Sequence, residues 1–289
     1  ALAQAHETRD RLAAAFALPL AAFEVVVIRV TGDVVQDRAL KDIGGKGLFT
    51  REIEEALAAG GIDIAVHSMK DMPVLQPEGL VIDCYLPRED VRDAFVSLQG
   101  GGLMGLPVGA VVGSSSLRRR AQVLVRRPDV QLVEFRGNVQ TRMRKLGEGV
   151  AAATFLAMAG LNRLGMQVGQ APVAPEEMLP AVAQGAIGVE RRTPDDRVAE
   201  MLAAIHHTET GLQLAAERAF LTRLDGSCQT PIAGLALPDG GLWLRGEILK
   251  PDGSAVVAGA LRGAAGDGAA LGRALADELL GRAGPGFFG

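Results

Sequence analysis

The sequence has few cysteines, no long apolar run and no excess of basic residues. Two cysteines, Cys84 and Cys228, are too few for a disulfide framework, and no cysteine or histidine spacing predicts a metal site, so we expect a reducing compartment. Charge or glycine interrupts every apolar stretch well before the roughly twenty residues that a membrane-spanning helix needs. A formal net charge of -4 argues against a surface that binds polyanions in general. We therefore predict a soluble, cytoplasmic protein that binds neither membranes nor nucleic acids.

Positive charge is concentrated in one window, residues 113–145, although the chain as a whole is acidic. The window holds two acidic residues and nine basic ones: Arg118, Arg119, Arg120, Arg126, Arg127, Arg136, Arg142, Arg144 and Lys145. Such a segment indicates either a nucleic-acid surface or a pocket for small anions. Phe135 is the only aromatic residue of the window, so bases would have no stacking partners, and we favour the small-anion pocket.

The stretch Asp63–Pro73 predicts a buried strand that ends abruptly in polar residues. Its apolar half suits a strand covered on both faces of a parallel sheet, and Pro73 prevents a central strand from continuing. Lys70 and Asp71 then lie just beyond the carboxyl end, where open α/β sheets bind ligands. A carboxylate beside a lysine at that place is a candidate for charge or proton transfer on a bound molecule. The alternative is that both are ordinary turn residues.

Two further segments place basic groups at predicted helix starts. A strand over Val108–Val112 leads into three serines and three arginines, and one of the serines is expected to cap the following helix. Cations in the first turn oppose the helix dipole by about 0.3–1 kcal/mol each, so a bound carboxylate or phosphate would stabilise this arrangement. A strand over Val130–Phe135 followed by Arg136–Arg142 repeats the pattern. The alternative is a solvated basic helix face.

Three other regions complete the prediction. A helix over residues 2–18 has no start signal, so we expect an element before it, and a strand follows over Phe23–Val30. Lys46 lies among glycines, which suggests either a mobile loop over a ligand or a plain connector. Cys228 lies in a Gly-Ser-Cys-Gln-Thr-Pro loop that would present its side chain, although a free cysteine is more often buried and inert. Strands followed by a helix after residue 231 predict a small α+β domain.

Seven motifs occur together along the chain, and no single one would be diagnostic. They are Gly44–Phe49, His67–Pro73, Gly113–Arg119, Arg136–Arg142, Ala159–Gly165, Gln184–Ala186 and Gly226–Pro231. In order and approximate spacing they resemble the porphobilinogen deaminase family, also called hydroxymethylbilane synthase. The resemblance covers nearly the whole chain. The family's first strand, which carries an arginine and a serine of the substrate site, has no counterpart in this sequence.

The resemblance implies a fold of two doubly wound α/β domains, like those of periplasmic binding proteins, plus a small α+β C-terminal domain. Domain 1 is expected over residues 1–88 and 185–204, domain 2 over 92–180 and domain 3 over 208–289. The implied reaction condenses four molecules of porphobilinogen, each with loss of ammonia, onto a covalent dipyrromethane cofactor and releases linear hydroxymethylbilane. We expect a monomer with porphobilinogen as its small-molecule partner.

The resemblance also implies a role for each matching residue. Cys228 would hold the dipyrromethane through a thioether, and Asp71 would stabilise positive charge and carry protons. The expected cofactor-binding residues are Lys70, Ser115, Ser116, Arg118, Arg119 and Gln184. The expected substrate-binding residues are Lys46, Arg136, Arg142 and Arg163.

Two other classes of protein remain open on the sequence. A solute-binding protein for small carboxylates would share a two-lobed architecture and a basic cleft, but it leaves Cys228 and the third domain unexplained. An RNA-binding module would use the basic window, and its affinity would fall steeply with salt.

Overall fold

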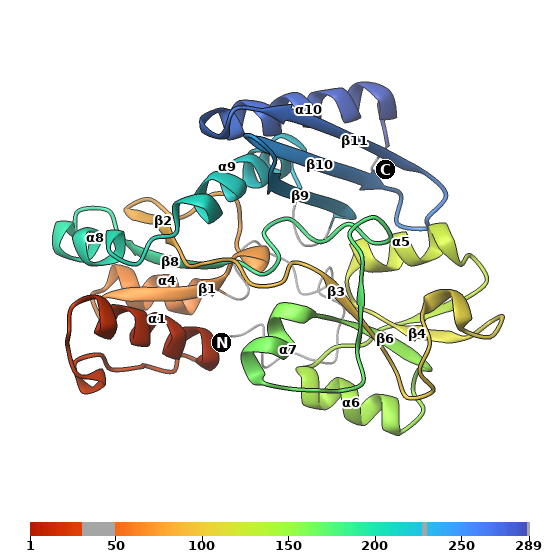
Figure 1. The fold of residues 1–289 in the computed structure, drawn as a ribbon, viewed down its shortest axis with the longest axis horizontal. Helices are drawn as coiled ribbons and strands as arrows, with labels where there is room; N and C mark the ends of the chain where they lie inside the picture. Colours follow the sequence, from red (N-terminus) through yellow and green to blue (C-terminus); the bar gives the residue numbers. More distant parts are fainter. Residues whose placement is uncertain (31–49, 227–229, 288–289) are drawn as a thin grey trace.

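The computed structural model describes residues 1–30, 50–226 and 230–287. The chain forms three units, each consisting of one sheet and its helices, and the three units meet at the middle of the molecule (Figure 1). The predicted fold class, two α/β units followed by a small α+β unit, is confirmed by this order of elements. The exact domain boundaries stay a prediction. Within the described part of the chain, no helix combines the length and apolar character that crossing a membrane requires.

The first sheet has the order β1-β8-β2, and both pairs are antiparallel. Its strands are β1 (Ile64–Ser68), β2 (Leu80–Tyr85) and β8 (Ile187–Arg192). The helices around it are α1 (Leu2–Ala15), α4 (Arg51–Ala58) and α8 (Asp196–Ala203), with short 3-10 turns η1 (Leu20–Ala22) and η2 (Met69–Asp71). The central strand β8 follows all the elements of the second unit in the sequence. The first unit is therefore discontinuous in sequence.

Two strand predictions in this unit are wrong. β1 does not lie in a parallel sheet covered on both faces: it pairs antiparallel with β8, and only Ala65 and His67 are fully buried. The chain returns from the second unit and enters the sheet from the opposite end, which reverses the pairing. The expected strand over Phe23–Val30 is also absent, because residues 24–30 have no ladder partner among the described residues.

The second sheet is mixed and has the order β5-β4-β6-β3-β7. β4 runs parallel to β5 and β6, whereas β3 is antiparallel to β6 and β7. Its strands are β3 (Asp93–Ser97), β4 (Val111–Gly113), β5 (Gln131–Val133), β6 (Ala153–Ala157) and β7 (Ala171–Val173). Its helices are α5 (Leu117–Arg126), α6 (Val139–Gly147) and α7 (Met158–Leu164), with the 3-10 turn η3 (Leu103–Gly105). α5 and α6 each begin shortly after a strand, as the sequence predicts.

The third unit is an antiparallel meander covered by two helices, α9 and α10, that pack on each other. Its elements are β9 (Ile232–Pro238), β10 (Leu242–Leu249), β11 (Val256–Gly263), α9 (Thr208–Arg223), η4 (Ala265–Asp267) and α10 (Gly268–Ala283). The strands followed by a helix confirm the small α+β unit that the sequence predicts.

A buried carboxylate joins the three units where the chain crosses between the first two. Glu217 of α9 is fully buried and accepts hydrogen bonds from Arg88 at 2.7 and 3.0 Å. It also accepts from the backbone N–H groups of Ala183 and Ala236 at 2.6 and 2.7 Å. Arg88 and Ala183 lie on the two crossings, and Ala236 lies on β9, so one side chain holds both crossings against the third unit.

The two crossings lie directly against each other. The Glu89 N–H donates to the Gly185 carbonyl at 3.2 Å. Gly185 has φ +87°, and a Cβ at that position would overlap the Glu89 carbonyl. Glycine is required there because both the backbone conformation and the close approach exclude a side chain.

Candidate active site

The turn that carries Lys70 and Asp71 follows β1 directly and is anchored on both sides. Met69 and Met72 are 1% and 5% exposed and belong to the hydrophobic cluster that contains Phe220 of α9. The apolar residues are fixed in the core, so the two charged residues between them are displayed at the strand end. The structure confirms the predicted position of Lys70 and Asp71, which lie just beyond the carboxyl end of β1.

The loop after this turn is fixed by the third unit. The Arg218 guanidinium of α9 donates to the carbonyls of Pro73 and Val74 at 2.9 and 3.1 Å. Burial lowers the pKa of Arg218, which is consistent with a guanidinium removed from water for these two bonds.

The start of α5 confirms the predicted serine cap. The Ser116 hydroxyl accepts the Arg119 N–H at 3.4 Å, and the Ser115 hydroxyl accepts the Phe135 N–H at 3.0 Å. A hydroxyl that accepts a backbone N–H still has its own proton to donate. Both serines can therefore donate to an anion at this helix end.

Arg118 and Arg119 share one buried carboxylate, Asp93, at the start of β3. Arg118 donates to Asp93 at 2.7 and 3.2 Å, and Arg119 donates at 3.0 and 2.7 Å. The Gln184 amide adds a fifth bond at 3.1 Å. Although burial alone would raise the pKa of Asp93, the two guanidinium groups hold it well below its ordinary value. Asp93 therefore stays ionised and orients three of the predicted cofactor-binding side chains.

Arg142 lies next to Arg119, because both guanidinium groups donate to the Phe155 carbonyl, at 3.4 and 2.9 Å. Burial lowers the pKa of Arg142 to about 10, and the charge of Arg119 contributes while that of Asp71 opposes. Burial also lowers the pKa of Lys70, which Asp71 partly restores and Arg119 lowers further. The charges of Asp71 and Arg119 change the pKa of both Lys70 and Arg142, and such effects require neighbouring groups. Lys70 and Asp71 therefore lie beside Arg119 and Arg142.

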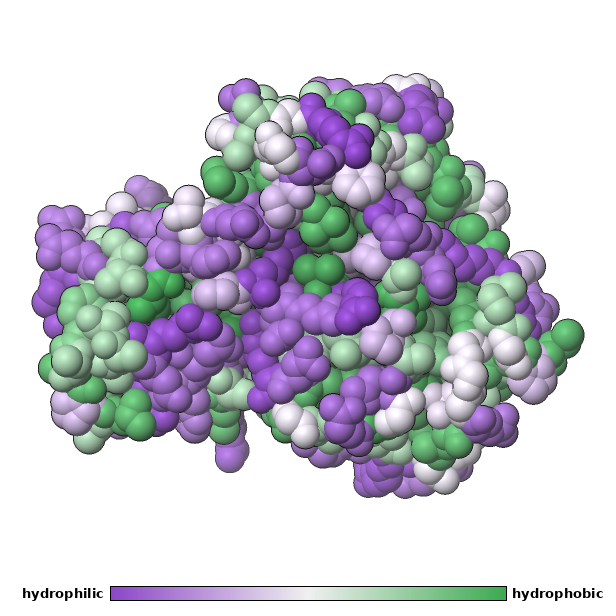
Figure 2. All heavy atoms as spheres, in the orientation of Figure 1, coloured by the Kyte–Doolittle hydropathy of each residue, from purple (hydrophilic) through white to green (hydrophobic). Residues whose placement is uncertain are grey.

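The assembled cluster carries more positive than negative charge. Among the described residues, four cations (Lys70, Arg118, Arg119 and Arg142) lie with two carboxylates (Asp71 and Asp93), which leaves an excess of two positive charges. Buried charges without counter-charges are costly, so a bound anion would stabilise this cluster. The Arg118 Nε is buried and has no hydrogen-bond partner among the described residues. Figure 2 shows hydrophilic side chains gathered where the three units meet.

The remaining predicted site residues divide into three cases. Arg163 lies on α7 and binds Glu7 and the carbonyl of Gly185, the residue after Gln184. Arg136 lies between β5 and α6 and is half-buried. Lys46 and Cys228 lie outside the described residues. Asp93 and Glu7 were not predicted from the sequence, and the only signal for Asp93 was the charged stretch that it ends, residues 88–93.

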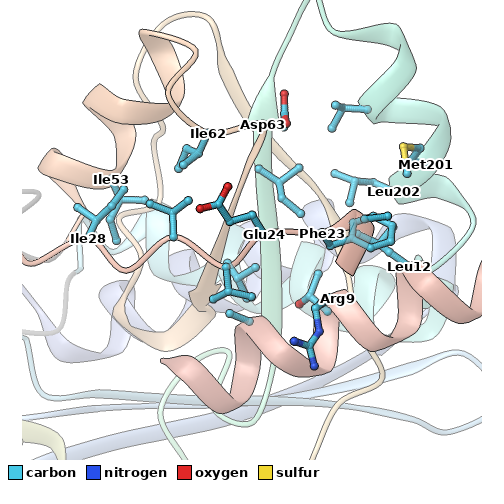
Figure 3. A pocket seen from close by; sticks show the side chains of 18 of the residues that line it. Arg9, Leu12, Phe23, Glu24, Ile28, Ile53, Ile62, Asp63, Met201 and Leu202 are labelled. Carbon is cyan, nitrogen blue, oxygen red and sulfur yellow. The ribbon is translucent and has the colours of Figure 1, made fainter. Parts of the chain in front are cut away.

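A separate cavity of about 530 Å³ in the first unit does not include the cluster. It is lined mainly by apolar side chains of α1, β1, α8 and residues 22–28. Figure 3 shows Leu12, Phe23 and Leu202 at one end of this cavity and Ile28 and Ile53 at the other. Its lining has no convergent set of cations, so the charged cluster is the candidate site.

Asp93→Asn should lower the free energy of unfolding by about 3–5 kcal/mol, because it leaves two buried guanidinium groups without their counter-charge. Asparagine has nearly the same shape, so the loss would come from charge. The measurement is urea unfolding of the parent protein and of Asp93→Asn at pH 7.

The effect should depend on pH with a defined sign. The pKa of Asp93 in the folded state lies below its ordinary value of 3.8, so its stabilisation is present above pH 3.8 and is lost as the pH falls below it. The difference between parent and Asp93→Asn should be constant above about pH 5 and shrink in more acidic solution. An equal stability of the two proteins at pH 7 would contradict this role of Asp93.

Comparison with known proteins identifies the family. Residues 1–200 match the family model "Porphobilinogen deaminase, dipyromethane cofactor binding domain", and residues 212–281 match "Porphobilinogen deaminase, C-terminal domain". A porphobilinogen deaminase of Paracoccus denitrificans is 70% identical over 290 residues, which cover 100% of this chain and 93% of the relative. A chloroplastic porphobilinogen deaminase of Pisum sativum is 53% identical over 296 residues, covering 100% of this chain and 80% of the relative.

Solved structures are more distant. A periplasmic substrate-binding protein of an ABC transporter from Coxiella burnetii has a TM-score of 0.40 and 15% identity, over 74% of this chain and 92% of that one. That score is too low to carry an argument about function or detailed fold. The two family models, together with the curated relatives, establish that the chain belongs to the porphobilinogen deaminase family.

Proposed function

We propose that Asp71 is the catalytic group of this porphobilinogen deaminase and that the cluster around Arg119 and Arg142 holds the carboxylates of the reacting pyrroles. The family's enzymes are transferases that condense four porphobilinogen molecules stepwise onto a dipyrromethane primer and release hydroxymethylbilane. The chain has this activity because it belongs to the family. The observation that supports the assignment of residues is the excess of two positive charges, among the described residues, in the cluster that contains Asp71.

The residues of the cluster fit a dipyrromethane. Each pyrrole unit of this group carries an acetate and a propionate, so the group would bring several carboxylates to one place. Arg119, the hydroxyls of Ser115 and Ser116, and the Nε of Arg118 can receive them; that Nε has no partner in the described part of the chain. Lys70 and Gln184 complete the set. When bound, the cofactor supplies the pyrrole carbon to which the first substrate is joined.

Asp71 has two tasks in this proposal. Loss of ammonia leaves positive charge on the substrate, and a carboxylate at the strand end stabilises that charge. Bond formation then releases a proton from the attacked pyrrole carbon, and the same carboxylate can accept it. Asp71 is exposed, so incoming substrate can reach it, whereas Arg118 and Arg119 are buried.

Cys228 is proposed as the attachment point through a thioether, and Lys46 as a cation that approaches the substrate. Arg136, Arg142 and Arg163 are proposed for incoming substrate or the growing chain. The reaction needs a reduced thiol at Cys228, which supports a cytoplasmic location. We further propose that the protein acts as a monomer and without nucleic acid or membrane. The burial of Arg118 and Arg119 on Asp93 supports a small-anion site over a nucleic-acid surface.

Arg119→Ala and Arg142→Ala should fail at different stages. Arg119→Ala removes charge-assisted bonds worth about 1.5–3 kcal/mol each and should impair cofactor assembly. Arg142→Ala should yield cofactor-loaded enzyme that stalls during elongation. The measurements are the intact mass of the denatured proteins before and after addition of porphobilinogen.

The control is Arg144→Ala, because Arg144 lies on the same helix as Arg142 but is 69% exposed and bound to Glu148. It should assemble cofactor and elongate like the wild type. Wild-type turnover in Arg119→Ala and Arg142→Ala would instead show that the basic window is a solvated helix face.

A further inference from the structure

The guanidinium of Arg163 is already bound to a carboxylate of the protein. Its Nε donates to Glu7 Oε2 at 3.2 Å, and one terminal nitrogen donates to the Gly185 carbonyl at 3.0 Å. The Arg163 side chain is 10% exposed and the Glu7 side chain 28%. Glu7 lies on α1 of the first unit and Arg163 on α7 of the second, and the two helices are in contact (Figure 1).

Glu7 is not held in place by Arg163 alone. Its other oxygen, Oε1, accepts from Arg11 one helical turn later at 3.3 Å. If Arg163 released it, Glu7 would keep a cationic partner on its own helix. Arg163, in contrast, would keep only its hydrogen bond to the neutral Gly185 carbonyl among the bonds that the structure describes, and it would need another anion. Glu7 can therefore move away from Arg163 with a small loss of free energy, because Arg11 still pairs with its carboxylate.

We propose that Glu7 is a resident carboxylate that occupies Arg163 in the empty enzyme and competes with a carboxylate of the incoming pyrrole for it. The inference rests on the proposed role of Arg163 in substrate binding. A carboxylate binds an arginine best through two parallel N–H groups of one edge of the guanidinium. The edge that contains Nε is taken by Glu7 and Gly185, so a substrate carboxylate reaches it only when Glu7 withdraws.

This exchange makes Glu7 a determinant of substrate affinity. Each binding event replaces one carboxylate on Arg163 by another. The free energy needed to displace Glu7 therefore lowers the observed affinity for the substrate. The guanidinium is never left buried and uncompensated between cycles, which would be costly. A partly exposed ion pair is worth only a modest amount, so the competition should change affinity by less than about a factor of ten.

The alternative is that Glu7 and Arg163 only fasten α1 to α7. In that case, loss of the charge would lower the stability of the protein and leave substrate affinity unchanged. Kinetics and binding separate the two roles, because only a competitor for Arg163 makes the substrate bind more tightly when it is removed.

The test is Glu7→Gln in the cofactor-loaded enzyme. We expect the KM for porphobilinogen to fall about threefold to tenfold with kcat unchanged. The dissociation constant for a non-reacting probe should fall by a similar factor when measured by calorimetry; the probe is a pyrrole with the same acetate and propionate but no aminomethyl group. In an Arg163→Ala background, Glu7→Gln should have no further effect, because the competition operates through that guanidinium.

The matched control is Glu278→Gln, because Glu278 is bound to Arg282 on α10 at the same distance of 3.2 Å and lies far from α7 in the chain. It should leave both constants unchanged. An unchanged or raised dissociation constant in Glu7→Gln would overturn the inference, whatever the stability of the variant. Failure of the wild type to release ammonia from porphobilinogen would count against the proposed function instead, and the calorimetric comparison would still decide the role of Glu7.

Discussion

Asp71→Asn should reduce steady-state ammonia release from porphobilinogen by about a hundredfold to ten-thousandfold, while the protein remains folded and loaded with cofactor. Asparagine fills nearly the same space and keeps a carbonyl that accepts hydrogen bonds. It carries no negative charge and cannot accept a proton at neutral pH, so both proposed tasks of Asp71 would be lost. Asp71 is exposed, whereas Met69 and Met72 anchor the turn, so the fold should tolerate the change.

Two further variants make the test specific. Asp71→Glu keeps the charge but displaces it, so it should retain more activity than Asp71→Asn. Asp63→Asn removes an exposed carboxylate just before the same strand and should leave the rate unchanged, because Asp63 pairs with Arg192 away from the cluster. If Asp71→Asn turned over within about threefold of the wild type, another group would perform the chemistry.

Cys228→Ser should contain no covalent pyrrole adduct and should show no turnover above background. A serine hydroxyl is a far weaker nucleophile than a thiolate, so the thioether to the primer could not form under physiological conditions. The variant should still fold, because the substitution exchanges one sulfur for one oxygen. Full activity of Cys228→Ser would show that the primer is attached elsewhere or is not needed.

Cys84→Ser is the matched control for that experiment. Cys84 lies in the core of the first unit, where burial raises the pKa of its thiol to about 12 and its Sγ donates to the Leu202 carbonyl at 3.4 Å. Such a thiol is not nucleophilic at neutral pH, so it is not a site for cofactor attachment. Cys84→Ser should keep the adduct, although it can lose some stability.

Local patterns in the sequence predicted the parts of the site that depend on neighbouring residues. A strand that ends in charged residues placed Lys70 and Asp71, and the run of serines before the arginines predicted the Ser116 cap of α5. Both predictions depend on the chemistry of a few consecutive residues. The structure confirms both, and for the turn at Lys70 the distant contacts of α9 support the local preference.

Features that depend on distant residues could not be predicted in the same way. The antiparallel pairing of β1 arises from β8, which lies more than a hundred residues later and enters only after the second unit. The carboxylate of Asp93 lies 25 and 26 residues before the two arginines that it binds, and 91 residues before Gln184. The Glu7–Arg163 pair spans 156 residues. No periodicity or cap specifies such pairs.

The most direct test of the central claim is the intact mass of the denatured wild-type protein before and after exposure to porphobilinogen. The account predicts a mass greater than that of the sequence by two pyrrole units, which then increases by whole pyrrole units when substrate is added. An active enzyme with the mass of the bare sequence and a freely alkylatable Cys228 would contradict the account.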